Sequence, residues 1–101
     1  MLRKIVIFKG NQIIYKREYG ETFSWEAISP LLTSLTYFLE ETKEDVAADI
    51  LNTVFYKIAY STNKNQGLLY ILITDIGDPD EVIAEQIQSF NMAVSKILEG
   101  A

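Results

Sequence analysis

Residues 68–76, with the sequence LLYILITDI, form an apolar run in the second half of the chain. Seven of the first eight residues are uncharged, and most of these are aliphatic or aromatic. The run is too short to span a membrane, and apolar and polar residues do not alternate along it. A segment of this kind predicts a central β-strand with both faces covered.

A helix is expected directly after this strand. Asp78 is placed as its N-cap, Pro79 at its first position and Glu81 three residues after the cap, a combination that satisfies free N–H groups. Gly100 is placed at its end. Apolar residues recur at intervals of four and three, as on one helix face: Ile83, Ile87, Phe90, Val94 and Ile97.

The chain begins with a predicted hairpin. Leu2–Lys9 contains four consecutive apolar residues and predicts a second strand that is covered on both faces. Gly10–Gln12 predicts a turn, and Ile13–Tyr19 predicts the return strand. Lys16 and Arg17 suit a sheet edge, where charge discourages unwanted pairing.

The next predicted element is an amphipathic helix with Ser24 as its cap. Its apolar stripe consists of Trp25, Ile28, Leu32, Leu35 and Leu39. Pro30 falls inside it, where a proline removes a backbone hydrogen bond. We expect a first turn that runs into a kink at Pro30; the alternative is a separate helix that starts at Pro30 with Ser29 as its cap.

The segment between this helix and the central strand is predicted to hold two strands. Glu40–Asp49 is an acidic connection with a last helical turn at Asp45–Ala48. Strands are expected at about 48–52 and 54–62, followed by a hairpin loop at Ser61–Gly67. Alternation assigns Val54, Tyr56, Ile58 and Tyr60 to one face, and Phe55, Lys57, Ala59 and Ser61 to the other.

The predicted order is β-β-α-β-β-β-α. We therefore predict an α+β sandwich, with a five-stranded, mostly antiparallel sheet and helices on both faces, in a single domain of residues 1–101. The segments are too short for a membrane span, and the apolar run before Lys9 lacks a signal-peptide cleavage site. The absence of cysteine fits a reducing compartment, so we expect a cytoplasmic protein.

Net charge is −5, which argues against a general nucleic-acid binder. The charge is unevenly distributed, because residues 1–19 carry +4 and residues 20–101 carry −9. Two interpretations stay open for the basic first hairpin: a charged, solvated edge, or a surface that faces an acidic partner or a lipid surface.

The sequence lacks most residues used in catalysis. With no histidine and no cysteine, triads of Ser-His-Asp or Cys-His type are excluded, and no phosphate-binding glycine motif is present. The acids at 75–81 could hold Mg²⁺ or Ca²⁺, although capping explains most of them. We expect no enzymatic activity, no cofactor and no metal. Surface positions that we predict to bind a protein partner are Lys16, Arg17, Glu26, Thr33, Tyr37 and Glu40.

Five segments carry a family resemblance. The hairpin IVIFKGNQIIY leads to the helix AISPLLTSLTYFLEE, then to FYKIAYST, LLYILITD and a closing amphipathic helix. This order resembles longin domains, particularly the short stand-alone archaeal kind. The resemblance covers nearly the whole chain and rests on hydrophobic patterns.

The resemblance implies a protein-binding platform. Longin domains occur in vesicle-trafficking SNAREs, in adaptor and tethering complexes, and in assemblies that regulate Ras-like small GTPases; the family has no shared active site. We therefore expect a non-enzymatic module that scaffolds or regulates a Ras-like GTPase or a trafficking-type complex, as a homodimer or as a heterodimer with a related domain. The alternative is a roadblock-like GTPase regulator, a fold that usually has a helix before its first strand.

Overall fold

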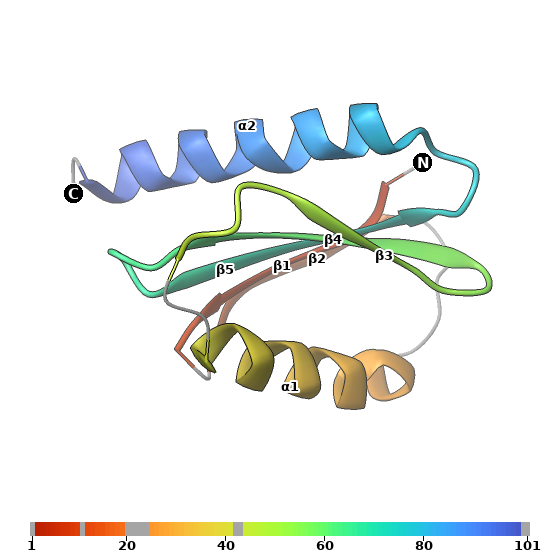
Figure 1. Cartoon of the computed structure of the whole chain (residues 1–101), viewed down its shortest axis with the longest axis horizontal. Helices are drawn as coiled ribbons and strands as arrows, with labels where there is room; N and C mark the ends of the chain where they lie inside the picture. Colours follow the sequence, from red (N-terminus) through yellow and green to blue (C-terminus); the bar gives the residue numbers. More distant parts are fainter. Residues whose placement is uncertain (1, 11, 20–24, 42–43, 100–101) are drawn as a thin grey trace.

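The computed structural model describes residues 2–10, 12–19, 25–41 and 44–99, with the side chains of 25–28, 31, 38–40 and 99 left out. Seven elements follow one another along the chain (Figure 1): β1 (Leu2–Lys9), β2 (Gln12–Glu18), α1 (Trp25–Glu41), β3 (Asp49–Asn52), β4 (Tyr56–Asn63), β5 (Leu68–Asp75) and α2 (Asp80–Glu99).

The strands form one sheet in the order β2-β1-β5-β4-β3, and every neighbouring pair is antiparallel. Figure 1 shows α1 on one face of this sheet and α2 on the other. The prediction of an α+β fold, with a five-stranded antiparallel sheet between helices, is therefore confirmed. The face that α1 covers is called the α1 face, and the face that α2 covers is called the α2 face.

β1 and β5 lie side by side in the interior of the sheet. All residues of β5 from Leu68 to Thr74 are buried, as are Lys4 to Phe8 of β1. Alternate residues of each strand enter opposite faces, so a run without alternation is what two covered faces require. The two predictions of doubly covered strands are thus confirmed.

Two apolar cores result, one on each side of the sheet. The α1 face packs Leu32 and Leu35 against alternate strand residues: Val6, Phe8, Ile58, Tyr60, Leu69, Ile71 and Ile73. The α2 face packs Ile83 and Ile87 against the other set: Ile5, Ile7, Ala59, Leu68, Tyr70 and Leu72. The alternation that the sequence predicted for residues 56–60 is confirmed by this division.

The observed bounds of α1 decide between the two predicted alternatives for Pro30. A single helix runs from Trp25 to Glu41 with Pro30 inside it, so a separate helix that starts at Pro30 is wrong. Leu32 and Leu35, just beyond the proline, are each 5% exposed. Their burial against the sheet offsets the backbone hydrogen bond that a proline removes.

The predicted helical turn at Asp45–Ala48 is also wrong. The Val46 N–H donates to Thr62 Oγ1 at 2.8 Å, and the Val46 carbonyl accepts from the Thr62 N–H at 2.9 Å. The Asp45 carboxylate accepts from the Lys64 N–H at 2.7 Å. These bonds to the end of β4 and its loop take the place of the bonds within a helical turn.

The loop between β4 and β5 is shorter than predicted. Strand pairing continues to Asn63, opposite Leu68, and Ser61 and Thr62 are buried within the ladder. Gly67 closes the loop with a φ of 69°, which a residue without a Cβ adopts readily. The predicted strand end at 62 is one residue short, and the predicted loop start at Ser61 is wrong, because the ladder pairs the polar residues 61–63.

Residues 54 and 55 were predicted to begin a strand, but they lie outside β4, which begins at Tyr56. Val54 and Phe55 form the turn between β3 and β4, and they are 81% and 73% exposed. Thr53 holds this turn, since its N–H and hydroxyl both donate to the Tyr56 carbonyl, at 2.8 and 2.9 Å.

The last helix, α2, begins at Asp80, one residue later than predicted.

Candidate functional site

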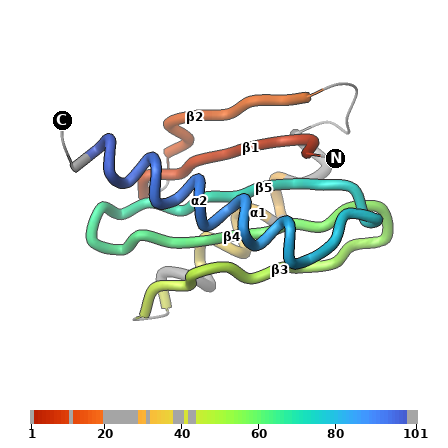
Figure 2. The backbone as a smooth tube through the Cα atoms, turned by 90° about the horizontal axis from the view of Figure 1, so that it is seen from above, coloured from red at the N-terminus to blue at the C-terminus, as the bar shows by residue number. Residues whose placement is uncertain are grey.

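β2 forms one edge of the sheet and is exposed along its whole length. All seven of its residues are exposed, and β1 is its neighbour in the sheet. In Figure 2, which views the molecule from the α2 side, α2 crosses the middle of the sheet and β2 lies at the margin. This edge presents side chains on both faces and backbone groups at its outer side.

The ladder between β1 and β2 contains a bulge that determines which side chains share a face. Tyr15 lies opposite Ile7, but Ile13 lies opposite Phe8, so Ile14 is the extra residue. Strict alternation would place Ile13 and Lys16 on opposite faces. The bulge brings them both to the α1 face, because Lys16 lies opposite Val6.

A groove runs between β2 and α1 on this face, and we call it the β2–α1 groove. Its volume is about 390 Å³, and it is lined by Phe8, Ile13, Lys16, Ser29, Leu32, Thr33, Thr36 and Tyr37. Phe8 and Leu32 are buried and form an apolar floor. Tyr37, which is 66% exposed, and Thr33 stand at the helix side. The Thr36 hydroxyl donates to the Leu32 carbonyl at 2.8 Å, within the helix.

The structure brings three of the six predicted partner-binding residues together in this groove: Lys16, Thr33 and Tyr37. Arg17 does not join them. It lies opposite Ile5 on the α2 face, with its guanidinium carbon 4.9 Å from the centre of the Tyr19 ring. Glu26 and Glu40 lie in α1, but their side chains are outside the described residues.

Sequence reasoning missed five residues that line the groove: Phe8, Ile13, Ser29, Leu32 and Thr36. Ile13 was placed on the second strand, but its face depends on the bulge at Ile14. A bulge of this kind leaves no mark in a pattern of alternating residues. The sequence predicted Phe8 and Leu32 as core residues. They do belong to the core, and they also form the floor of the groove.

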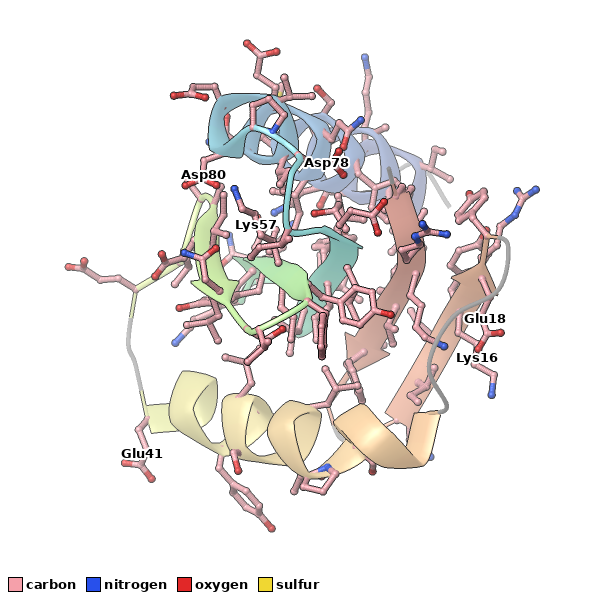
Figure 3. The ribbon with its side chains drawn as sticks, turned by 90° about the vertical axis from the view of Figure 1, so that its right-hand side faces the viewer. Lys16, Glu18, Glu41, Lys57, Asp78 and Asp80 are labelled. Atoms are coloured by element: carbon pink, nitrogen blue, oxygen red, sulfur yellow. The ribbon has the colours of Figure 1, made fainter. Side chains whose placement is uncertain are left out.

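Two of the four acids at 75–81, Asp75 and Asp80, form ion pairs with cations of the same chain. Asp75 accepts from Arg3 Nε at 2.8 Å and from Arg3 Nη2 at 3.2 Å. This bidentate hydrogen bond lowers the pKa of Asp75 below its ordinary value and raises that of Arg3. Figure 3 shows Lys57 beside Asp78 and Asp80, and its ammonium donates to the Asp78 carbonyl and to the Asp80 carboxylate.

These contacts engage the carboxylates of Asp75 and Asp80 within the chain. Within the described part of the chain, no group of three or more Asp and Glu side chains has an arrangement that could hold a metal ion. Asp80 joins α2 to β4, and Asp75 joins β5 to β1. Their roles in the described structure are therefore bonds between elements.

The molecule's described helices do not include one that is long and apolar enough to cross a membrane. No model of a known protein family matches the chain, and no curated protein matches it significantly.

Proposed function

We propose that this chain is a non-enzymatic protein-interaction module of longin-like architecture, and that it binds a protein partner in the β2–α1 groove. The partner class is a Ras-like small GTPase or a component of a trafficking-type complex. The groove supports a protein partner because it joins an apolar floor to a polar rim, the composition typical of protein interfaces. The partner class comes from the resemblance to longin domains.

The observation that supports this proposal most directly is the convergence of Lys16, Thr33 and Tyr37 on one groove. These residues come from a strand and a helix that are distant in sequence. An exposed tyrosine beside a buried apolar floor is a common centre of binding energy in interfaces. Lys16 belongs to the basic first hairpin, so it would favour an acidic segment of the partner.

The roadblock-like alternative receives no such support. A helix at residues 1–9 would have favoured it, and residues 2–9 form β1. Among the acids at 75–81, Asp75 and Asp80 are engaged with Arg3 and Lys57, so the contacts of these two residues lend no support to the metal-binding alternative.

Light scattering tests the proposal on the purified chain, alone and mixed with a Ras-like GTPase of the same organism in its GDP and GTP-analogue forms. We expect a larger complex with at least one nucleotide form. Thr33→Trp should abolish that complex, because Thr33 lines the groove and an indole there would fill it.

Ser34→Trp is the matched control, since Ser34 is the adjacent exposed residue of α1 and does not line the groove. It should bind like the unmodified chain, and both variants should keep the parent melting temperature. Failure of every nucleotide form to bind contradicts the GTPase assignment. Equal loss in both tryptophan variants contradicts the groove.

A further inference from the structure

The outer edge of β2 carries a pattern of side chains that is complementary to itself. Beyond the bulge, Tyr15, Arg17 and Tyr19 lie on the α2 face, while Lys16 and Glu18 lie on the α1 face. One face of this edge strand thus carries an arginine between two tyrosines, and the other carries a lysine beside a glutamate. Such an edge is a template for another strand unless its charges oppose that pairing.

We propose that two copies of this chain pair through β2, antiparallel, about a two-fold axis that passes between the two Arg17 residues. The two sheets then join into one sheet of ten strands. In this register, Lys16 of each copy faces Glu18 of the other on the α1 face, and Tyr15 faces Tyr19 on the α2 face. The pairing goes beyond the proposed function, because it does not depend on the identity of the groove's partner.

Charge selects this register among the closed ones. Centring the two-fold axis on Lys16 would place two lysines directly opposite each other and would make no Lys–Glu pair to offset their repulsion. Centring it on Tyr15 would place Arg17 opposite Ile13, which the bulge turns to the other face. Centring it on Arg17 makes two Lys–Glu pairs and two aromatic pairs on matching faces.

The cost of this register is a pair of arginines across the axis. Each guanidinium is held over the ring of its own Tyr19, 4.9 Å from the ring centre. Since the two Tyr19 residues lie at opposite ends of the five-residue ladder, the guanidinium groups lean away from each other. The repulsion is thereby reduced.

Glu18 is held in place for this role. Its Oε1 accepts from Lys4 Nζ at 2.7 Å, and Lys4 is fully buried. The Glu18 side chain itself is 45% exposed, and Figure 3 shows it with Lys16 at the β2 margin of the molecule. A carboxylate has about four lone-pair sites, so Glu18 can receive the lysine of a second copy in addition to the partners that it has within its own chain.

Single cysteines test the register directly, because the chain has no cysteine of its own. Residues opposite each other across an antiparallel pair have Cα atoms about 5 Å apart, within disulfide range. In the proposed register this applies to two copies of position 17. Copies of position 16 would be about 8 Å apart and copies of position 15 about 14 Å apart, beyond the limit of about 7 Å.

We therefore expect Arg17→Cys to form a disulfide-linked dimer on mild oxidation, whereas Tyr15→Cys and Lys16→Cys stay largely unlinked. Met92→Cys, on exposed α2, measures linkage by random collision. Linkage of Tyr15→Cys or Lys16→Cys above that background, with Arg17→Cys at background, overturns the register.

Sedimentation velocity tests the dimer without modification. The unmodified chain should pass from monomer to dimer as its concentration rises. Lys16→Glu should raise the dissociation constant about tenfold or more, because it replaces two attractive pairs with two repulsive ones. Lys9→Glu, the same charge change on β1 outside the ladder, should leave it unchanged.

A chain that stays monomeric at every concentration overturns the dimer, and so does an open series of larger species, which edge pairing without a two-fold axis would produce. Either result leaves the proposed function standing if the GTPase still binds. Loss of GTPase binding in a chain that still dimerises removes the proposed function alone.

Discussion

Replacing Tyr60 by phenylalanine should change how the stability of this protein depends on alkaline pH. Tyr60 is 4% exposed, and its hydroxyl donates to Asp49 Oδ2 at 2.8 Å, across the β3–β4 ladder. The pKa of Tyr60 is raised from 10.0 to about 12; burial of the phenol is the largest cause, and the hydrogen bond to the Asp49 carboxylate is the second. The neutral phenol is therefore the form that the folded state prefers.

The sign of the effect follows from this raised pKa. Below pH 10, the phenol is neutral in both states and its stabilising contribution is fully present. Between about pH 10 and pH 12 the unfolded chain releases the proton while the folded chain keeps it, so stability falls as pH rises. Two pKa units correspond to about 2.7 kcal/mol in total, of which about 2 kcal/mol is lost by pH 12.

Urea unfolding followed by circular dichroism, at several pH values between 8 and about 12, measures this loss. At pH 8, Tyr60→Phe should be less stable than the parent by about 1.5 to 3 kcal/mol, the value of a hydrogen bond to a charged group. That difference should shrink by about 2 kcal/mol at pH 12. Tyr37→Phe, at a residue that is 66% exposed, should follow the parent at every pH. A constant difference between Tyr60→Phe and the parent would refute the reasoning.

Two further predictions concern ion pairs. Glu18→Ala should lower the free energy of unfolding by about 3 kcal/mol, because it takes a carboxylate from the buried Lys4 ammonium. Lys4→Met should lower it little, because the half-exposed Glu18 carboxylate is hydrated. Equal losses in urea unfolding would contradict this asymmetry. The lowered pKa of Asp75 stabilises the fold above the ordinary value near pH 4, and that contribution is lost as pH falls through the lowered pKa. Asp75→Asn should therefore lose less stability than the parent on acidification below about pH 4, and parallel melting curves would exclude this role.

The sheet interior could be predicted from sequence because its signal is local. Leu68–Asp75 is apolar on both faces, and β5 occupies these residues. Where the prediction failed, the competing interaction was non-local. Asp45 and Val46 read as the end of a helix, but they bind Thr62, whose position relative to them depends on the folded sheet.

The candidate site was predictable only in part for the same reason. Thr33 and Tyr37 were placed on the exposed side of α1, since that position depends on helical periodicity alone. Their meeting with Lys16 depends on the bulge at Ile14 and on the side of the sheet that α1 covers. Arg17 was grouped with Lys16 as a neighbour in sequence, and the pleat of the strand separates them.

The pairing of β1 with β5 also bears on the order in which the protein folds. The hairpins β1–β2, β3–β4 and β4–β5 join neighbours in sequence, but β1 must wait for a strand that begins at Leu68. Closing a loop of that length carries a large entropic cost, so this step should set the folding rate. During synthesis, the apolar β1 has no central partner until two thirds of the chain has been made. The basic residues of the first hairpin would then help to keep the nascent segment soluble.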